Sequence, residues 1–249
     1  MIVVFGGPSI HGIDDALLEG LEVRAPALCG DLLRAVHDGA KVIGLIDGVF
    51  ESVASVWHKE ILFALSRDVA VLGSSSMGAL RAAECRAFGM IGVGAIYEDY
   101  AAGRRCADAD VAVSHAPAEL GFQPLSLALV DAEYTLNALK GSGALSAQDH
   151  AAALASARSM HFKDRTWNTL ITGAFPEERH ASALVELVTS VHHSRKTLDA
   201  GELLTLLQSG KQMSRSGPDF DLSVTQYLAR LRDATLQPQA RPDPREPRP

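Results

Sequence analysis

Cysteine is scarce in this chain, and its scarcity excludes two kinds of architecture. The three cysteines, Cys29, Cys85 and Cys106, are odd in number and lie far apart, without a CxxC pair. A disulfide framework needs paired cysteines and a structural zinc site needs closely spaced ones, so we expect neither. This cysteine usage favours a reducing cytoplasm. The nine histidines form no cluster at ligand spacing, and we expect no metal site.

Long apolar runs and basic clusters are also missing. No apolar stretch approaches the roughly 20 residues that a membrane helix requires, and the N-terminal MIVVF lacks the basic flank of a signal peptide. The net charge is -7, and no basic stripe exceeds the pair Arg104 and Arg105. We therefore expect neither a membrane segment nor a nucleic-acid partner. GxGxxG and the P-loop signature are both absent, so the sequence gives nucleotide binding little support.

Apolar residues make up 47% of the chain, which is ample for a large core, and they are patterned differently in its two halves. Buried-strand patterns occur in the first half, at 2–5, 41–47 and 69–72. Amphipathic patterns predict helices at 14–19, 29–37, 52–66, 77–87, 95–102, 125–139, 147–159, 178–189, 198–207 and 224–236. The predicted fold is α/β, a mostly parallel sheet with flanking helices, followed by an α-helical C-terminal half.

The same patterns divide the chain into three segments. We expect an α/β core at 1–120 that carries the functional site, and a helical region at 121–236 packed on that core. The last segment, 237–249, alternates proline with arginine and acidic residues and has almost nothing to bury, which is typical of a disordered tail.

Each predicted strand ends in a polar or glycine-rich turn. GGPS follows the first strand at 6–9, Asp47 and Gly48 end the second, and three serines at 74–76 follow the third. The carboxyl ends of parallel strands meet at one edge of a sheet, where ligands usually bind. The sequence therefore predicts the functional site at this edge.

The serine turn, GSSSMG at 73–78, allows two interpretations. A strand that turns abruptly into a helix can lift a serine out of the sheet as a nucleophile elbow, and Ser76 has the appropriate spacing. The N–H of Met77 would then stabilise an oxyanion. The other interpretation is a helix N-cap, a position that serine favours. The two interpretations are compatible.

Other candidates also have a structural alternative. Asp47 could orient a base or simply form a turn, and Gly6 and Gly7 could donate an N–H to the site or only shape a loop. Lys59 lies on a polar helical stripe, where it is either solvated or, if desolvated beside the serines, a base. Arg81 could pair with a neighbouring acid or face an anionic substrate.

Several motifs together resemble the TfuA family. They are GGPS at 6–9, IDGVF at 46–50, VWHKEI at 56–61, GSSSMGALRAAE at 73–84 and FGMIGVG at 88–94. They occur in the family's order over roughly residues 1–140. Ser74 stands where the family pattern usually has alanine, which adds a third candidate hydroxyl.

TfuA proteins are partners of YcaO enzymes, which activate a peptide amide with ATP during thioamidation. The resemblance implies an accessory hydrolase that releases sulfide from a thiocarboxylated ThiS-type sulfur carrier and assists a YcaO-type enzyme with its precursor peptide. It implies a Ser–Lys pair without a cofactor, with Lys59 as base and Ser76, in preference to Ser75, as nucleophile. Met77 and either Gly6 or Gly7 would hold the oxyanion.

In this interpretation Arg81 would face the anionic thiocarboxylate. The rival hypothesis is a non-catalytic adaptor that docks a YcaO enzyme to its precursor peptide and uses the serine turn only as a helix cap. The sequence is compatible with a homo-oligomer and does not determine the oligomeric state.

Overall fold

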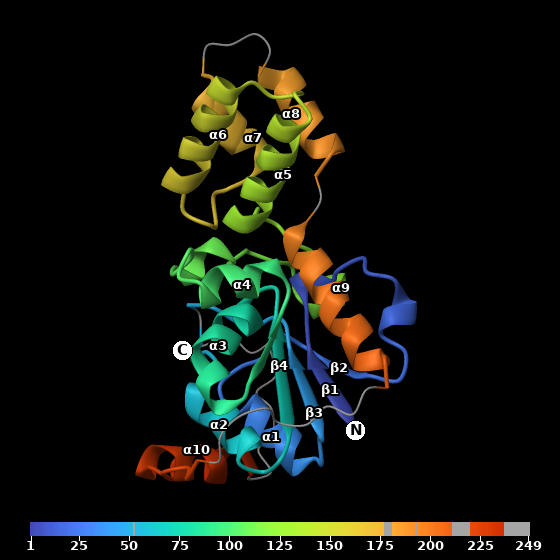
Figure 1. Cartoon of the computed structure of the whole chain (residues 1–249), viewed down its shortest axis with the longest axis vertical. Helices are drawn as coiled ribbons and strands as arrows, with labels where there is room; N and C mark the ends of the chain where they lie inside the picture. The colour runs from blue at the N-terminus through green and yellow to red at the C-terminus, as the bar shows by residue number, and fades with distance from the viewer. Residues whose placement is uncertain (52, 177–180, 193, 211–219, 237–249) are drawn as a thin grey trace.

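A computed structural model describes the chain at residues 1–51, 53–176, 181–192, 194–210 and 220–236 (Figure 1). The tail expected at 237–249 and the first three residues of the helix expected at 178–189 lie outside the described residues. Within the described ranges, no helix is long and apolar enough to cross a lipid bilayer.

The described residues form one parallel sheet of five strands, which confirms the predicted α/β class. Three strands are the predicted ones: β1 (Ile2–Phe5), β3 (Val42–Leu45) and β4 (Ala70–Ser74). The two edge strands, β2 (Glu22–Arg24) and β5 (Ile91–Val93), have three residues each, too few for a recognisable alternation. The strand order is β2-β1-β3-β4-β5, so the carboxyl ends of β1, β3 and β4 are neighbours at one edge.

Helices surround this sheet and continue into a helical C-terminal half, as predicted. In the described ranges they are α1 (Asp31–His37), α2 (His58–Leu65), α3 (Met77–Cys85), α4 (Ala95–Ala101), α5 (Leu129–Gly141), α6 (Ala147–Ser159), α7 (Trp167–Ala174), α8 (Ala181–Ser190), α9 (Arg195–Gln208) and α10 (Gln226–Leu236).

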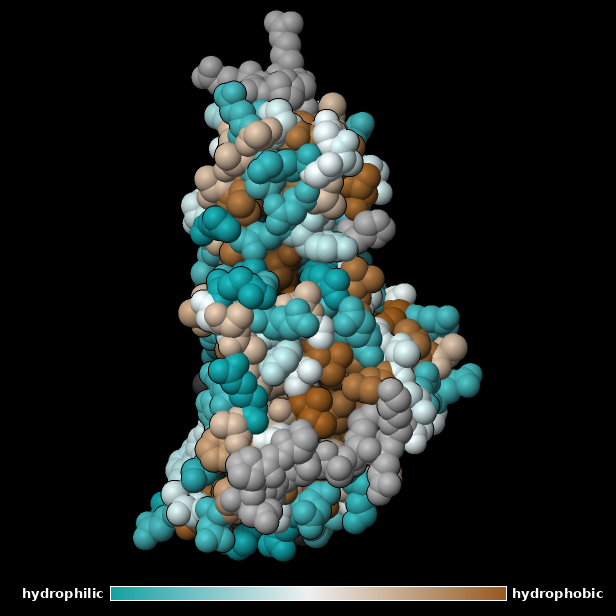
Figure 2. Space-filling view, in the orientation of Figure 1, coloured by the Kyte–Doolittle hydropathy of each residue, from teal (hydrophilic) through white to brown (hydrophobic). Residues whose placement is uncertain are grey.

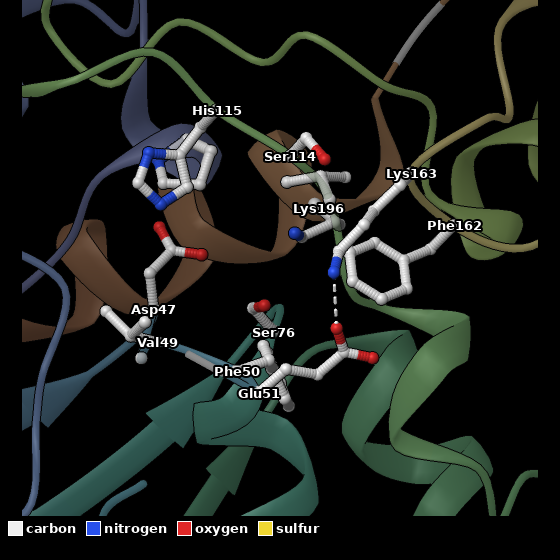
Figure 3. Close-up of a pocket in the computed structure, with 13 residues that line it drawn as sticks. Asp47, Val49, Phe50, Glu51, Ser76, Ser114, His115, Phe162, Lys163 and Lys196 are labelled. Atoms are coloured by element: carbon white, nitrogen blue, oxygen red, sulfur yellow. Dashed lines mark ion pairs between the residues drawn. The ribbon is translucent and has the colours of Figure 1, made fainter. Parts of the chain in front are cut away.

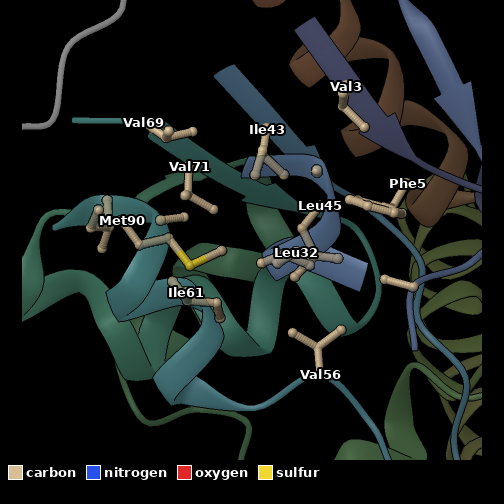
Figure 4. Close-up of a cluster of buried hydrophobic side chains, with 14 of the residues drawn as sticks. Val3, Phe5, Leu32, Ile43, Leu45, Val56, Ile61, Val69, Val71 and Met90 are labelled. Atoms are coloured by element: carbon tan, nitrogen blue, oxygen red, sulfur yellow. The ribbon is translucent and has the colours of Figure 1, made fainter. Parts of the chain in front are cut away.

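Side chains alternate along the strands and divide the core between the two faces of the sheet. Val3, Ile43 and Val71 belong to one face, where they pack with α1, α2 and α3 (Figure 4). Val4 and Leu72 belong to the other face, where they pack with leucines of α9. Beside α9, apolar surface remains visible over the strands (Figure 2).

The helical half has two different packing partners. Helices α5 to α8 share a hydrophobic cluster of their own and stand together at one end of the molecule (Figure 1). Helix α9 instead returns to the sheet, and α10 packs against α1. The chain therefore leaves the α/β core after α4 and comes back to it at α9, which brings the N-terminus of α9 to the sheet.

The helix expected at 52–66 begins only at His58. The side chain of Glu60 explains this start, because one of its carboxylate oxygens accepts the backbone N–H of Trp57 at 3.1 Å. Its other oxygen accepts the N–H of Gly30, just before α1, at 2.7 Å. A single buried carboxyl group thus caps α2 and ties it to α1.

Burial raises the pKa of Glu60 from 4.5 to about 7, against the opposing effect of its backbone hydrogen bonds. A carboxyl whose folded-state pKa is raised stabilises the fold most when protonated, and this stability is lost as pH rises from about 4.5 to about 7. The loss should reach at most about 3 kcal/mol. Glu60→Gln should remove this component, measured as a smaller decrease in unfolding free energy between pH 5 and pH 8. The exposed Glu119→Gln is the control, and equal slopes for parent and Glu60→Gln would contradict the assignment.

Candidate functional site

The three serines at the end of β4 and in the turn to α3 point their side chains in different directions. The hydroxyl of Ser74 donates to the backbone oxygen of Asp199 in α9, at 2.8 Å. The Ser75 hydroxyl is buried without a hydrogen-bond partner in the described structure. The Ser76 hydroxyl lies 3.5 Å from the backbone oxygen of Val111 and lines a cavity of about 530 Å³. Ser76 is therefore the one of the three that a ligand in this cavity would meet.

The backbone of this turn is strained in the manner of an elbow. Ser75 has a φ of 66°, in the left-handed region that residues other than glycine rarely adopt. Ser76 follows with φ -105° and ψ -124° and immediately precedes α3. Met77 is the first residue of α3, so helix geometry leaves its N–H without an intrahelical acceptor. The local geometry therefore matches the predicted elbow, with a backbone donor next to the Ser76 hydroxyl.

A lysine from a distant part of the sequence meets Ser76 in this cavity. Lys196, the second residue of α9, is 3% exposed, and its Nζ donates to the same Val111 oxygen at 2.8 Å. Its backbone N–H donates to a carboxylate oxygen of Asp131 in α5, at 3.0 Å. Burial lowers the pKa of Lys196, while the carboxylates of Asp47 and Asp131 act in the opposite direction. The amine and the hydroxyl are thus held against one shared acceptor.

The predicted lysine, Lys59, does not line this cavity. Its Nζ lies 3.5 Å from the backbone oxygen of Ser223, ahead of α10. Arg81 does not line the cavity either. It donates to the backbone oxygen of Val56 at 3.0 Å and pairs with Glu84 at 2.6 Å. The sequence predicted correctly that both residues lie on helices. It did not predict which part of the structure each of these side chains would face.

Asp47 organises the loop that follows β1. One of its carboxylate oxygens accepts the N–H groups of Gly7 and Ser9, each at 2.9 Å, and the other accepts the Ser9 hydroxyl at 2.7 Å. Gly6 donates its N–H to the backbone oxygen of Arg24 at 3.0 Å. The N–H groups of Gly6 and Gly7, predicted as oxyanion donors, are therefore already bonded elsewhere, and only Met77 is left of the predicted donor set.

The resemblance of the motifs is supported by comparison with known families. Residues 47–166 match the model of the TfuA-like protein family. This region belongs to the TfuA-like family. No curated protein matches the chain. The match supports a role for the chain in a TfuA- and YcaO-associated pathway.

The TfuA-like region contributes most of the cavity wall, but not the buried lysine. Asp47 and Ser76 lie within residues 47–166, whereas Lys196 lies C-terminal to them. The TfuA-like region alone therefore lacks the amine that faces the Ser76 hydroxyl, and the return of α9 to the sheet supplies it.

The remaining residues of the cavity wall come from the loop after β3 and from segments beside the α5–α8 helices (Figure 3). Glu51, from the loop after β3, pairs with Lys163, from the loop between α6 and α7, at 2.7 Å. His115 lines the same cavity, from the segment that follows Val111. Sequence reasoning singled out neither Lys196 nor His115 for this site, because nothing in their local pattern points to a turn that lies 120 and 39 residues earlier in the chain.

Proposed function

We propose that this TfuA-like protein is a Ser–Lys hydrolase that releases sulfide from the C-terminal thiocarboxylate of a ThiS-type sulfur carrier and assists a YcaO-type enzyme with its precursor peptide. The observation that carries the proposal is the contact of the Ser76 hydroxyl and the Lys196 amine with the one backbone oxygen of Val111, inside a cavity. Lys196 takes the role that the family resemblance implied for Lys59.

The reaction begins with a proton transfer between these two side chains. Neutral Lys196 takes the proton of Ser76, and the Ser76 oxygen bonds to the carbon of the thiocarboxylate. The N–H of Met77 donates to the oxyanion that develops on this carbon. The sulfur then accepts one proton from an acid other than Lys196, the carbon–sulfur bond breaks, sulfur leaves as HS⁻, and an ester between the carrier and Ser76 is left.

Water completes the cycle. It attacks the ester carbon and gives up one proton, while the ammonium of Lys196 returns a proton to the Ser76 oxygen. The products are the carrier carboxylate and the free serine, so neither a metal nor a redox partner enters the balance. Burial supports the role of Lys196, because lowering the pKa of an amine increases the fraction that is neutral, and so able to accept a proton, near neutral pH.

The test is sulfide release from a thiocarboxylated carrier by the parent, Ser76→Ala and Ser75→Ala. Ser76→Ala should lose the activity by about a thousandfold or more, because no other hydroxyl of the turn faces the cavity. Ser75→Ala should keep it to within about tenfold, since that hydroxyl is buried away from the cavity.

An adaptor without catalysis gives a different result. In that case the parent and Ser76→Ala would release sulfide at the same rate as buffer, while both would still support a YcaO-type enzyme. That outcome would end the hydrolase proposal.

A further inference from the structure

Release of sulfur from a thiocarboxylate requires a proton on the sulfur atom. A sulfide dianion is too basic to leave, so the carbon–sulfur bond breaks as the sulfur departs in the form of HS⁻. Lys196 carries the proton that it took from Ser76, and Ser76 needs this proton back when the ester is hydrolysed. A second acid on the cavity wall could protonate the sulfur, so that Lys196 keeps its proton for the Ser76 oxygen. The inference below rests on the proposed function and assigns this second group.

His115 is placed for that role. It lines the same cavity as Ser76 and Lys196. Its Nδ1 lies 2.8 Å from the backbone oxygen of Ala116. Because a carbonyl oxygen can only accept, Nδ1 carries a hydrogen, and Nε2 is the ring atom available for proton exchange. In the described part of the chain, no hydrogen bond occupies Nε2.

The ring of His115 is held in place from several directions. Ala116 donates its N–H to Gln123, and Leu125 donates its N–H to Ser114, both at 2.8 Å. These bonds fix the backbone on each side of His115. Phe122 contacts the ring edge-on, with 5.6 Å between the ring centroids. An imidazole held in this way keeps one orientation, as a catalytic group requires.

The other ionisable groups of the cavity already have partners. Asp47 accepts three hydrogen bonds from Gly7 and Ser9, and Glu51 pairs with Lys163. Lys196 donates to the oxygen of Val111. Lys163 and Lys196 keep further N–H groups, but an imidazole is the side chain that ordinarily both gives and accepts a proton near neutral pH, as the two transfers require. Figure 3 shows its ring at the wall of the cavity that Asp47 and Lys196 also line.

We propose that His115 is the catalytic acid that protonates the departing sulfur. Nε2 of the imidazolium gives its proton to the sulfur, the carbon–sulfur bond breaks, and HS⁻ leaves. Water takes the position of the sulfur, and neutral His115 accepts a proton from this water as its oxygen bonds to the ester carbon. Lys196 then protonates the Ser76 oxygen. Thiocarboxylate and water thus give carboxylate, HS⁻ and one proton, and every side chain regains its starting state.

The experiment compares two leaving groups on one peptide. The peptide carries a C-terminal glycine as the thiocarboxylate, whose sulfur needs a proton, or as the para-nitrophenyl ester, whose phenolate leaves without one. His115→Asn can keep the hydrogen bond to Ala116 through its amide nitrogen but has no Nε2. It should lower sulfide release by about a hundredfold or more and leave the first burst of nitrophenolate within about threefold of the parent. Steady turnover of the ester should fall, because the later attack of water also uses His115.

Three further variants separate the possible outcomes. His115→Gln, which places an amide nitrogen near the position of Nε2, should behave like His115→Asn. His11→Gln should match the parent, since His11 also contacts a backbone oxygen through Nδ1, that of Gly121, but does not line this cavity. Equal loss of the burst and of sulfide release in both His115 variants, or no loss of either, would overturn the assignment. A burst that survives in Ser76→Ala would instead overturn the proposed function.

Discussion

Sulfide release should fall by about a thousandfold or more when Lys196 is replaced by methionine, and Lys59→Met should leave it within about twofold. Methionine keeps an apolar side chain of similar length at this buried position and removes only the amine. The loss of activity therefore measures the contribution of the amine as a base. Lys59 is the matched control, because its Nζ contacts a backbone oxygen near α10 and does not line the cavity. If Lys59→Met were inactive and Lys196→Met had normal activity, Lys59 in α2 would be the base instead.

The pH dependence of the parent provides a second measure of the same group. A lysine acts as a base only when it is neutral, so the rate should rise with pH and level off above the pKa of Lys196. Burial lowers this pKa from its ordinary 10.5, hence the midpoint of the rise should lie below that value. The measurement is the first burst of nitrophenolate from the para-nitrophenyl ester, whose leaving group needs no proton from His115, at a fixed substrate concentration from pH 6 to pH 10. A rate that falls steadily over this range would contradict a neutral lysine base.

Gly78→Ala should destabilise the protein by about 3 kcal/mol or more, the second large effect that we expect. A Cβ at Gly78 would lie 1.8 Å from the backbone oxygen of Leu45 in β3. Neither backbone can move easily, because the N–H of Gly78 also donates to the oxygen of Ile46 at 3.1 Å. The added methyl group therefore forces α3 away from the sheet and displaces the serine turn with it.

The measurement for Gly78→Ala is urea unfolding followed by circular dichroism. Gly141→Ala is the control, because a Cβ there would meet no atom within 4 Å at the end of α5. It should be neutral or stabilise the helix by up to about 1 kcal/mol. Equal unfolding midpoints for the two variants would show that α3 can shift without cost.

Short-range patterns predicted the part of the site that lies within a few residues of one turn. The apolar run of β4, the small residues after it and the composition of α3 are adjacent in the chain, and together they place Ser76 at a strand end. The same holds for Asp47 after β3. Alternation of side chains is a backbone property, so these elements could be recognised before any tertiary contact was known.

The features that the sequence did not predict depend on long-range contacts. The start of α2 depends on the Glu60 carboxyl, which also binds Gly30, 30 residues earlier. The apolar stripe of α9 resembles those of α5 and α6, although α9 packs on the sheet and the other two pack on each other. A stripe shows that a helix face is buried and contains no information on the surface that buries it.

Order along the chain was enough to predict the parallel sheet, the sharp turn that carries Ser76 and the family that residues 47–166 match. It was not enough to predict which lysine lies beside that turn. Lys59 and Lys196 are each the second residue of a helix, and only the path of α9 back to the sheet buries one amine beside Val111. The environment of an ionisable group depends on the surfaces that bury it, and these surfaces come from parts of the chain that are far apart in sequence.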